Sequence, residues 1–258
     1  MDRAWQIVES DAESFDEGPG ATASFGMVVL SVDRATVGDC GRFLAPFPGT
    51  EFYVSRVPMS AVASPASLAA MAEHLTEATA RLVPGGPLDA VAFSCTSGLV
   101  AIGAERVHEA LLAARPGVPV VTPVEAAARA LSGLGVRRLS VLAPYHIGAS
   151  DLVAGHFEDA GFVLDRCATF DLDGDLQMNR LSGAAIKAGA ARTLHPDSDA
   201  LFISCTGLRT AGLVADLEAA LGVPVVTSNQ ATVWGCLTAA GYPEMARGEG
   251  RLFAGAAA

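Results

Sequence analysis

The sequence contains no apolar run of the ~20 residues that a membrane-spanning helix needs. Residues 1–20 lack the basic start and the apolar segment of a secretory signal peptide. Lysine and arginine form no cluster, and the formal net charge is −11. These absences argue against nucleic-acid and membrane partners, and we expect a cytoplasmic protein. They leave an anionic small substrate open, because a local pocket can be positive on an acidic protein.

Motifs for cofactors are missing as well. There is no Walker-type phosphate loop and no strand-linked GxGxxG. The five cysteines form no CxxC pair and have no Cys/His spacing suited to zinc. We therefore expect no cofactor and no metal, and free thiols in a reducing compartment. The apolar share of 51% can fill a substantial core without disulfides.

Short apolar segments alternate with longer Ala/Leu-rich stretches from residue 25 onward. Continuous apolar segments are typical of parallel strands buried on both faces. The longer stretches have helical spacing, and several end at a glycine, as at Gly117, Gly135, Gly161 and Gly222. We expect strands at 26–32, 89–94, 118–122, 138–143, 199–204 and 223–227, and helices at 64–82, 98–114, 123–134, 148–160, 181–194, 210–221 and 230–240. This alternation predicts an α/β fold with parallel sheets flanked by helices.

An internal repeat is the most informative feature. The hexapeptide GVPVVT occurs at 117–122 and again at 222–227. Each copy follows a second match, DAVAFSCTSGL at 89–99 and DALFISCTGLR at 199–209. Because two motifs recur in the same order and at similar spacing, the chain is predicted to contain two similar α/β lobes.

A further match suggests the lobe boundaries. The segment VRRLSVLAPY at 136–145 mirrors the opening strand FGMVVLSVD at 25–33. Residues 1–20 are acidic and poor in aliphatic side chains, which indicates a flexible arm. The predicted domains are an acidic arm at 1–20, a first lobe at 21–121 plus 233–258, and a second lobe at 122–232.

Each copy of the repeat places a cysteine directly after a buried strand and before a predicted helix. Ligands bind at the carboxyl ends of strands in an open parallel sheet. The small polar residues that follow Cys95 and Cys205 can expose backbone N–H groups, which hold a carboxylate and stabilise a thiolate. A lone cysteine is more often a core residue, and we interpret Cys40 in a loop, Cys167 in a strand and Cys236 in a helix that way. The duplication predicts that Cys95 and Cys205 face each other as active-site thiols.

The motifs FSCTSG, APY, FISCTGLRT and SNQATVWGCLTAAG, in this order, resemble the aspartate/glutamate racemase superfamily. More narrowly, residues 24–245 are similar to maleate cis–trans isomerases, arylmalonate decarboxylases and the ectoine-utilisation proteins that cluster with them. The ectoine-utilisation branch resembles the chain most, since VLSVDRAT at 29–36 has Asp33 where maleate isomerases carry Asn. The resemblance implies two Rossmann-like lobes with pseudo-two-fold symmetry and a cofactor-independent site in the inter-lobe cleft.

The same resemblance implies roles for individual residues. Cys95 and Cys205 match the two superfamily cysteines, whereas arylmalonate decarboxylases have glycine in place of the first. Tyr145 matches a tyrosine that contacts substrate carboxylate in maleate isomerases. Asp175, like Asp33, stands where those enzymes use Asn, so an acid could serve as a general base or pair with a substrate ammonium. The predicted site comprises catalytic Cys95 and Cys205, substrate-binding Asp33, Thr96, Ser97, Tyr145, Asp175, Thr206, Gly207 and Leu208, and no metal ligand.

Several of these residues have a structural alternative. Asp33 could cap a helix or turn, Tyr145 could be an aromatic residue at the rim, and Asp175 lies in an acidic stretch that could be a solvated loop. Arg209 follows Cys205 by four residues, on the first turn of the predicted helix. It could bind a carboxylate or brace neighbouring acidic residues.

The predicted function is that of an isomerase acting on a small carboxylate through two facing thiols. In a racemase, one thiolate removes the α-proton and the opposite thiol delivers another; in a cis–trans isomerase, a thiolate adds to the alkene and is later eliminated. The alternatives are a decarboxylase or lyase that uses Cys205 as proton donor, and a non-catalytic protein that binds a small acid. The resemblance further implies a role in ectoine catabolism, and we expect a homo-oligomer, dimeric or higher.

Overall fold

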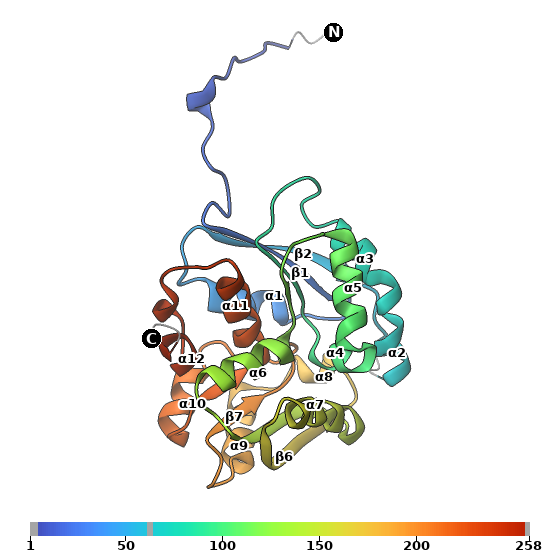
Figure 1. The fold of residues 1–258 in the computed structure, drawn as a ribbon, viewed down its shortest axis with the longest axis vertical. Coiled ribbons are helices and arrows are strands. Elements are labelled where there is room, and N and C mark those ends of the chain that lie inside the picture. Colours follow the sequence, from blue (N-terminus) through green and yellow to red (C-terminus); the bar gives the residue numbers. More distant parts are fainter. Residues whose placement is uncertain (1–4, 61–63, 256–258) are drawn as a thin grey trace.

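The computed structural model describes residues 5–60 and 64–255 as an α/β body from which the N-terminal arm extends (Figure 1). Two four-stranded parallel sheets form the body, in the orders β2-β1-β3-β4 and β6-β5-β7-β8. The first sheet consists of β1 (Ala23–Leu30), β2 (Thr50–Val57), β3 (Ala90–Phe93) and β4 (Val120–Val121). The second consists of β5 (Arg138–Tyr145), β6 (Val163–Leu172), β7 (Ala200–Ile203) and β8 (Val225–Thr227). The predicted fold class is therefore confirmed.

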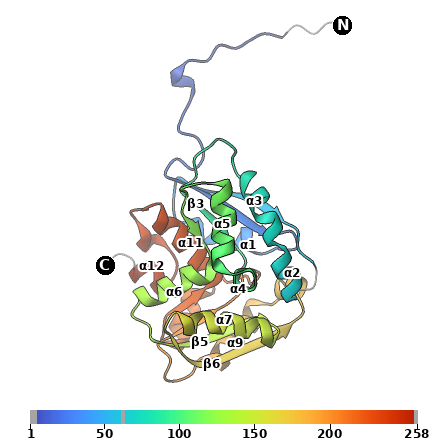
Figure 2. The ribbon, with the colours of Figure 1, turned by 45° about the vertical axis from the view of Figure 1, so that its right-hand side comes forward.

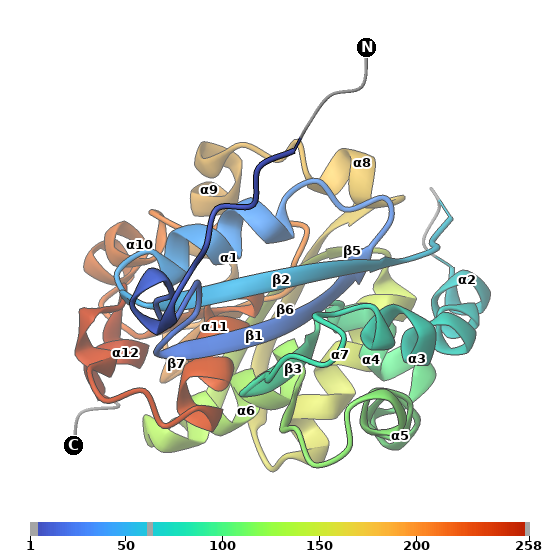
Figure 3. The ribbon, with the colours of Figure 1, turned by 90° about the horizontal axis from the view of Figure 1, so that it is seen from above.

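Helices flank both sheets. They are α1 (Thr36–Leu44), α2 (Pro65–Ala70), α3 (Ala72–Ala80), α4 (Thr96–Ile102), α5 (Ala104–Ala114), α6 (Pro123–Gly133), α7 (Ile147–Asp159), α8 (Asp175–Met178), α9 (Gly183–Thr193), α10 (Val214–Leu221), α11 (Ser228–Ala239) and α12 (Arg251–Gly255), with short 3₁₀ turns at Ala12–Ser14 and Met245–Arg247. Seen from above, β1 and β2 run side by side, with α1 on one flank and α3, α4 and α5 on the other (Figure 3). Figure 2 shows α7, α9, β5 and β6 gathered at the opposite end of the molecule from α3, α5 and β3.

The two copies of the sequence repeat form strands that pair in the same way, β3 with β1 and β7 with β5. The N–H of Ser94, after β3, donates to Val28 O at 2.8 Å, and the N–H of Ser204, after β7, donates to Leu142 O at the same distance. An aspartate before each of these strands, Asp89 or Asp199, accepts a hydrogen bond from the backbone of the neighbouring strand. The two cysteines therefore follow strands that occupy the same position in their sheets.

The expected strands and helices are found, although several boundaries differ. The four glycines expected to end helices have positive φ, from 75° at Gly135 to 92° at Gly161. The predicted helix at 98–114 is divided at Gly103, where φ is 94°. Cys40 was expected in a loop, and this was wrong: it lies in α1 and is fully buried.

The fold leaves the predicted domain boundaries as a proposal. Helix α11 follows β8 and packs against α1, α6 and β3, so it joins the two halves of the molecule. The lobes at 21–121 plus 233–258 and at 122–232 remain predictions, and residues 1–4, 61–63 and 256–258 of the predicted domains lie outside the described residues. Across the part of the chain that the structure describes, every helix is too short or too polar to span a membrane.

Candidate active site

Cys95 and Cys205 line the same cavity, although they belong to different sheets. Both side chains are buried, with 4% and 6% of their surface exposed. The other lining residues are Leu30, Met59, Leu68, Thr96, Ser97, Tyr145, Asp175, Met178 and Thr206. The cavity measures about 20 Å³, which is room for roughly one water molecule. A substrate therefore requires the cavity to widen.

Cys95 directly precedes helix α4 and caps its start, as the repeat predicted. Its backbone is extended, and its sulfur accepts the N–H of Gly98 at 3.2 Å, with Ser97 Oγ 3.9 Å away. Burial, together with the charge of Asp175, raises the pKa of Cys95 to about 12, while the donors from Gly98 and Ser97 oppose this shift. Gly98 also lets the sulfur approach, because a Cβ there would lie 2.8 Å from Sγ. The resting thiol is therefore protonated but surrounded by donors that would stabilise a thiolate.

Cys205 has a different local structure. Its φ of 94° is rare for a residue other than glycine. The sulfur accepts the N–H of Gly207 at 3.2 Å, and the Cys205 N–H donates to Ser228 Oγ at 3.0 Å. Burial first and Asp175 second raise the pKa of the Cys205 thiol, whereas hydrogen bonds from Tyr145 and Gly207 lower it. The two thiols are thus pseudo-equivalent in position but not in environment.

The helix expected at 210–221 begins later than predicted. Residues 206–213 lie outside helices and strands, and α10 begins at Val214. Arg209 is therefore not on a first helical turn; it is exposed, and its guanidinium donates to Leu181 O at 3.1 Å, outside the cavity lining.

Tyr145 and Asp175, which the family resemblance implied as substrate-binding residues, both line the cavity. The Tyr145 hydroxyl lies 3.3 Å from Ser204 Oγ, and burial raises the pKa of this phenol well above its usual value. Asp175 is the first residue of α8. Burial, followed by the charge of Asp33, raises the pKa of Asp175 to about 6.

Three predicted binding residues lie outside the cavity lining. Asp33 Oδ1 accepts the N–H groups of Ala35 at 2.7 Å and Thr36 at 2.9 Å, and Oδ2 accepts the Thr36 hydroxyl. Its carboxylate thus caps the start of α1, which is the structural alternative stated above. Gly207 contributes its N–H to Cys205, and Leu208 is fully buried. Thr96, Ser97 and Thr206 do line the cavity.

A buried polar network holds the turn after Cys205, and the sequence analysis missed its centre, Asp39. Asp39 Oδ2 accepts the Thr210 N–H at 3.0 Å and Asn229 Nδ2 at 2.9 Å, and Oδ1 accepts the Ala211 N–H at 3.0 Å. Asn229 Nδ2 also lies 2.9 Å from Thr206 O. The sequence around Asp39, VGDCGR, gave no signal for this role, although Asp39 is 2% exposed.

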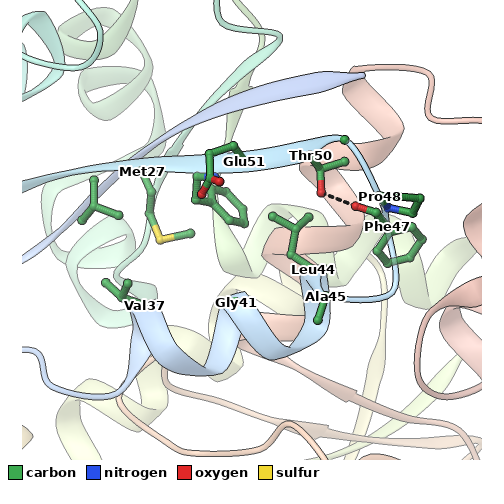
Figure 4. Close-up of a pocket in the computed structure, with 12 residues that line it drawn as sticks. Met27, Val37, Gly41, Leu44, Ala45, Phe47, Pro48, Thr50 and Glu51 are labelled. Atoms are coloured by element: carbon green, nitrogen blue, oxygen red, sulfur yellow. Dashed lines mark hydrogen bonds between the residues drawn. The ribbon is translucent and has the colours of Figure 1, made fainter. Parts of the chain in front are cut away.

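A larger groove lies away from the thiols, between α1 and β2 (Figure 4). It measures about 390 Å³ and is lined mainly by apolar side chains, among them Met27, Val37, Leu44 and Phe52. Glu51 is its one titratable side chain. Since the lining of this groove includes no cysteine, the small cavity between Cys95 and Cys205 is the candidate active site. Within the described ranges, no group of three or more His, Cys, Asp or Glu is placed to hold a metal ion.

We expect alkylation of Cys95 by iodoacetamide to rise about tenfold per pH unit between about pH 7 and pH 10, because only the thiolate reacts and the pKa of Cys95 is raised to about 12. Peptide mass spectrometry would measure the rate. The exposed Cys167 is an internal reference and should be labelled first. A rate for Cys95 that levels off below about pH 9 would instead show a preformed thiolate.

The fold and the cavity define a class of protein: a duplicated parallel α/β protein with one cysteine from each sheet in a shared cavity. The arylmalonate decarboxylase family matches residues 44–253. The chain belongs to this family, which groups arylmalonate decarboxylases with maleate isomerases in the aspartate/glutamate racemase superfamily. The predicted resemblance is therefore confirmed at this level.

Individual relatives include both activities. The chain is 29% identical over 238 residues to an arylmalonate decarboxylase of Bordetella bronchiseptica, covering 90% of this chain and 97% of that protein. It is 26% identical to a maleate isomerase of Pseudomonas putida, covering 80% and 84%. The structure of the maleate isomerase of Pseudomonas putida S16 with maleate matches with a TM-score of 0.82 at 20% identity, over 91% of this chain and 98% of that one. Unliganded arylmalonate decarboxylase matches with a TM-score of 0.75 at 28% identity, over 90% and 98%.

Proposed function

We propose that the chain is an isomerase that acts on a small carboxylate through Cys95 and Cys205. One observation carries the proposal: the two thiols come from equivalent positions of two sheets and line one cavity. A substrate carbon held between them presents opposite faces to the two sulfurs, which is the arrangement that racemisation needs. In this reaction the thiolate gains the α-proton and the opposite thiol gives one up, so the protons balance.

Backbone N–H groups can stabilise negative charge on the cysteine sulfurs and on the substrate. The N–H groups of Gly98 and Gly207 already point at the two sulfurs and would stabilise whichever thiolate forms. We propose that Thr96, Ser97 and Thr206 hold the substrate carboxylate, with Tyr145 as a further donor at the cavity wall. Donors placed around the carboxylate also stabilise the enediolate that develops when the α-proton leaves.

A second candidate is decarboxylation with Cys205 as the proton donor. The 29% identity to an arylmalonate decarboxylase supports it. In that reaction a single protonated thiol delivers a proton after carbon dioxide leaves, so Cys95 would not be needed. A homo-oligomeric assembly, a cytoplasmic location and a role in ectoine catabolism also remain predictions.

Proton NMR in deuterated water would test the proposal with amino acids, 2-substituted malonates and maleate as substrates. Exchange of the α-proton with loss of stereochemistry supports racemisation, and conversion of maleate to its trans isomer supports cis–trans isomerisation. Release of carbon dioxide from a malonate, without either of these, overturns the isomerase proposal in favour of the decarboxylase. The variant that lacks both cysteines gives the background rate.

A further inference from the structure

The walls of the cysteine cavity carry no positive side chain. Its described lining contains neither lysine, arginine nor histidine, and its one carboxylate is Asp175. Any substrate carboxylate must therefore be held by hydroxyl groups and backbone N–H groups. A second carboxylate on the substrate would meet either Asp175 or apolar side chains such as Leu30 and Leu68, and both are unfavourable surroundings for an anion.

Asp175 is a buried acid without a partner. Its exposed fraction is 9%, and no other described residue donates a hydrogen bond to its carboxylate; its own N–H is the single donor that favours the charged form. The one charge that shifts its pKa is the like charge of Asp33. The side-chain amide of Asn179, four residues along the chain, has other partners: its Nδ2 donates to Gly207 O at 3.1 Å, and its Oδ1 accepts the Arg34 N–H at 3.0 Å.

The carboxylate of Asp175 and the sulfur of Cys205 converge on one place. A Cβ on Gly207 would lie 3.2 Å from Asp175 Oδ1 and 3.3 Å from Cys205 Sγ. The Asp175 carboxylate and the Cys205 sulfur therefore lie on the same side of the cavity, and a larger residue at position 207 would crowd both. A group that binds Asp175 is consequently held next to the carbon that Cys205 would attack or protonate.

We propose that Asp175 binds a cationic group of the substrate, so that the substrate is an amino acid or another carboxylate carrying an ammonium group, and not a dicarboxylate. This assignment rests on the proposed function, because it places the reacting carbon between the two thiols. Buried charges persist when they are paired and hydrogen-bonded, and the protein supplies no cation here. The ammonium pairs with Asp175 while the carboxylate is held by the Thr96, Ser97 and Thr206 side of the cavity.

The same pairing would prepare the thiols. The charge of Asp175 contributes to the raised pKa of both Cys95 and Cys205. An ammonium that neutralises this charge lowers both pKa values towards the range in which a thiolate forms. A dianion bound in the same place raises them further. Substrates with an ammonium group would thus help to generate the nucleophile or base that acts on them.

Calorimetric titration of matched ligands tests the assignment. The pairs are alanine against propionate, 2-aminobutyrate against butyrate and serine against 3-hydroxypropionate, with both enantiomers of each amino acid, so that each pair differs by the ammonium group. Succinate, glutarate and maleate are titrated as the dicarboxylates. The native protein is expected to bind at least one amino acid about 100-fold more tightly than its counterpart, the usual effect of losing one partner of a buried charge pair. In Asp175→Asn this preference should disappear, and binding of the dicarboxylates and of maleate should improve.

Asp171→Asn is the matched control. Asp171 is exposed near the end of β6, shortly before Asp175 in the sequence, and its substitution removes the same charge. It should keep the preference for the ammonium group. The assignment is overturned if the native protein binds the counterparts equally well, if no amino acid binds, or if Asp175→Asn keeps the preference. Should maleate be isomerised in a reaction that needs both thiols, the substrate class fails while the proposed function stands. If the protein prefers ligands with an ammonium group but its turnover does not need the thiols, the substrate class stands and the proposed function fails.

Discussion

Replacement of Cys205 by alanine should lower kcat by about 10²–10⁴-fold, and replacement of Cys95 should do the same, because each removes a group that transfers a proton. The two residues come from different sheets and reach one cavity, so neither can take the place of the other. The measurement is turnover of whichever substrate the NMR screen identifies, with circular dichroism to verify folding. The loss should appear in kcat more than in KM, since the thiols act on the reacting carbon.

Cys167→Ala is the control for this pair. Cys167 is exposed on β6 and lies outside the cavity, so the variant should keep full activity. Activity retained in Cys95→Ala but lost in Cys205→Ala would contradict the two-thiol mechanism and support the decarboxylase, which needs a single proton donor. Activity retained in both variants would remove the cysteines from the chemistry altogether.

The repeated motifs predicted two similar sheets because each copy forms the equivalent strand of its sheet. Strands β3 and β7 are buried on both faces, so the sequence of each is a continuous apolar segment. The edge strand β2 was not among the expected strands, and of β6 only the position of Cys167 was assigned to a strand. Both are partly exposed, and polar residues interrupt their apolar ones, so a search for continuous apolar segments does not find them.

The site was harder to predict than the fold. That Cys95 and Cys205 line one cavity followed from duplication, and Tyr145 and Asp175 followed from the family resemblance. The left-handed backbone of Cys205 could not be predicted, because its cause lies in tertiary contacts: Ser228 holds its N–H, and Asn229 holds the carbonyl of Thr206. The motif after Cys205 resembles the helix start after Cys95, yet these contacts bend it into a turn.

Asp39 is the residue on which this turn most depends. It lies on α1, within the first half of the sequence, and its carboxylate accepts the N–H groups of Thr210 and Ala211 beyond Cys205. Asn229 Nδ2 joins it from α11. Three segments that are distant in sequence thus meet at one buried carboxylate, and each donor would be left without a partner if it were removed.

Asp39→Asn is therefore expected to lower the free energy of unfolding by about 3 kcal/mol, since hydrogen bonds to a buried charged group are lost. We also expect kcat to fall by about 10²-fold at temperatures where the variant is fully folded, because a small displacement of Cys205 spoils its alignment with the substrate. Denaturant titration measures the first effect and steady-state kinetics the second. Asp159→Asn, which changes an exposed aspartate of α7, is the control and should alter neither.

The two readouts separate a positioning role for Asp39 from a purely structural one. If Asp39 only stabilises the fold, the folded variant keeps native kcat, KM and rate of Cys205 alkylation, and the positioning role is wrong. If it positions Cys205, kcat falls with little change in KM, and the alkylation rate of Cys205 changes while that of Cys95 does not. The asymmetry follows from the contacts, because Asp39 hydrogen-bonds to the turn after Cys205, whereas Cys95 is held by the start of its own helix.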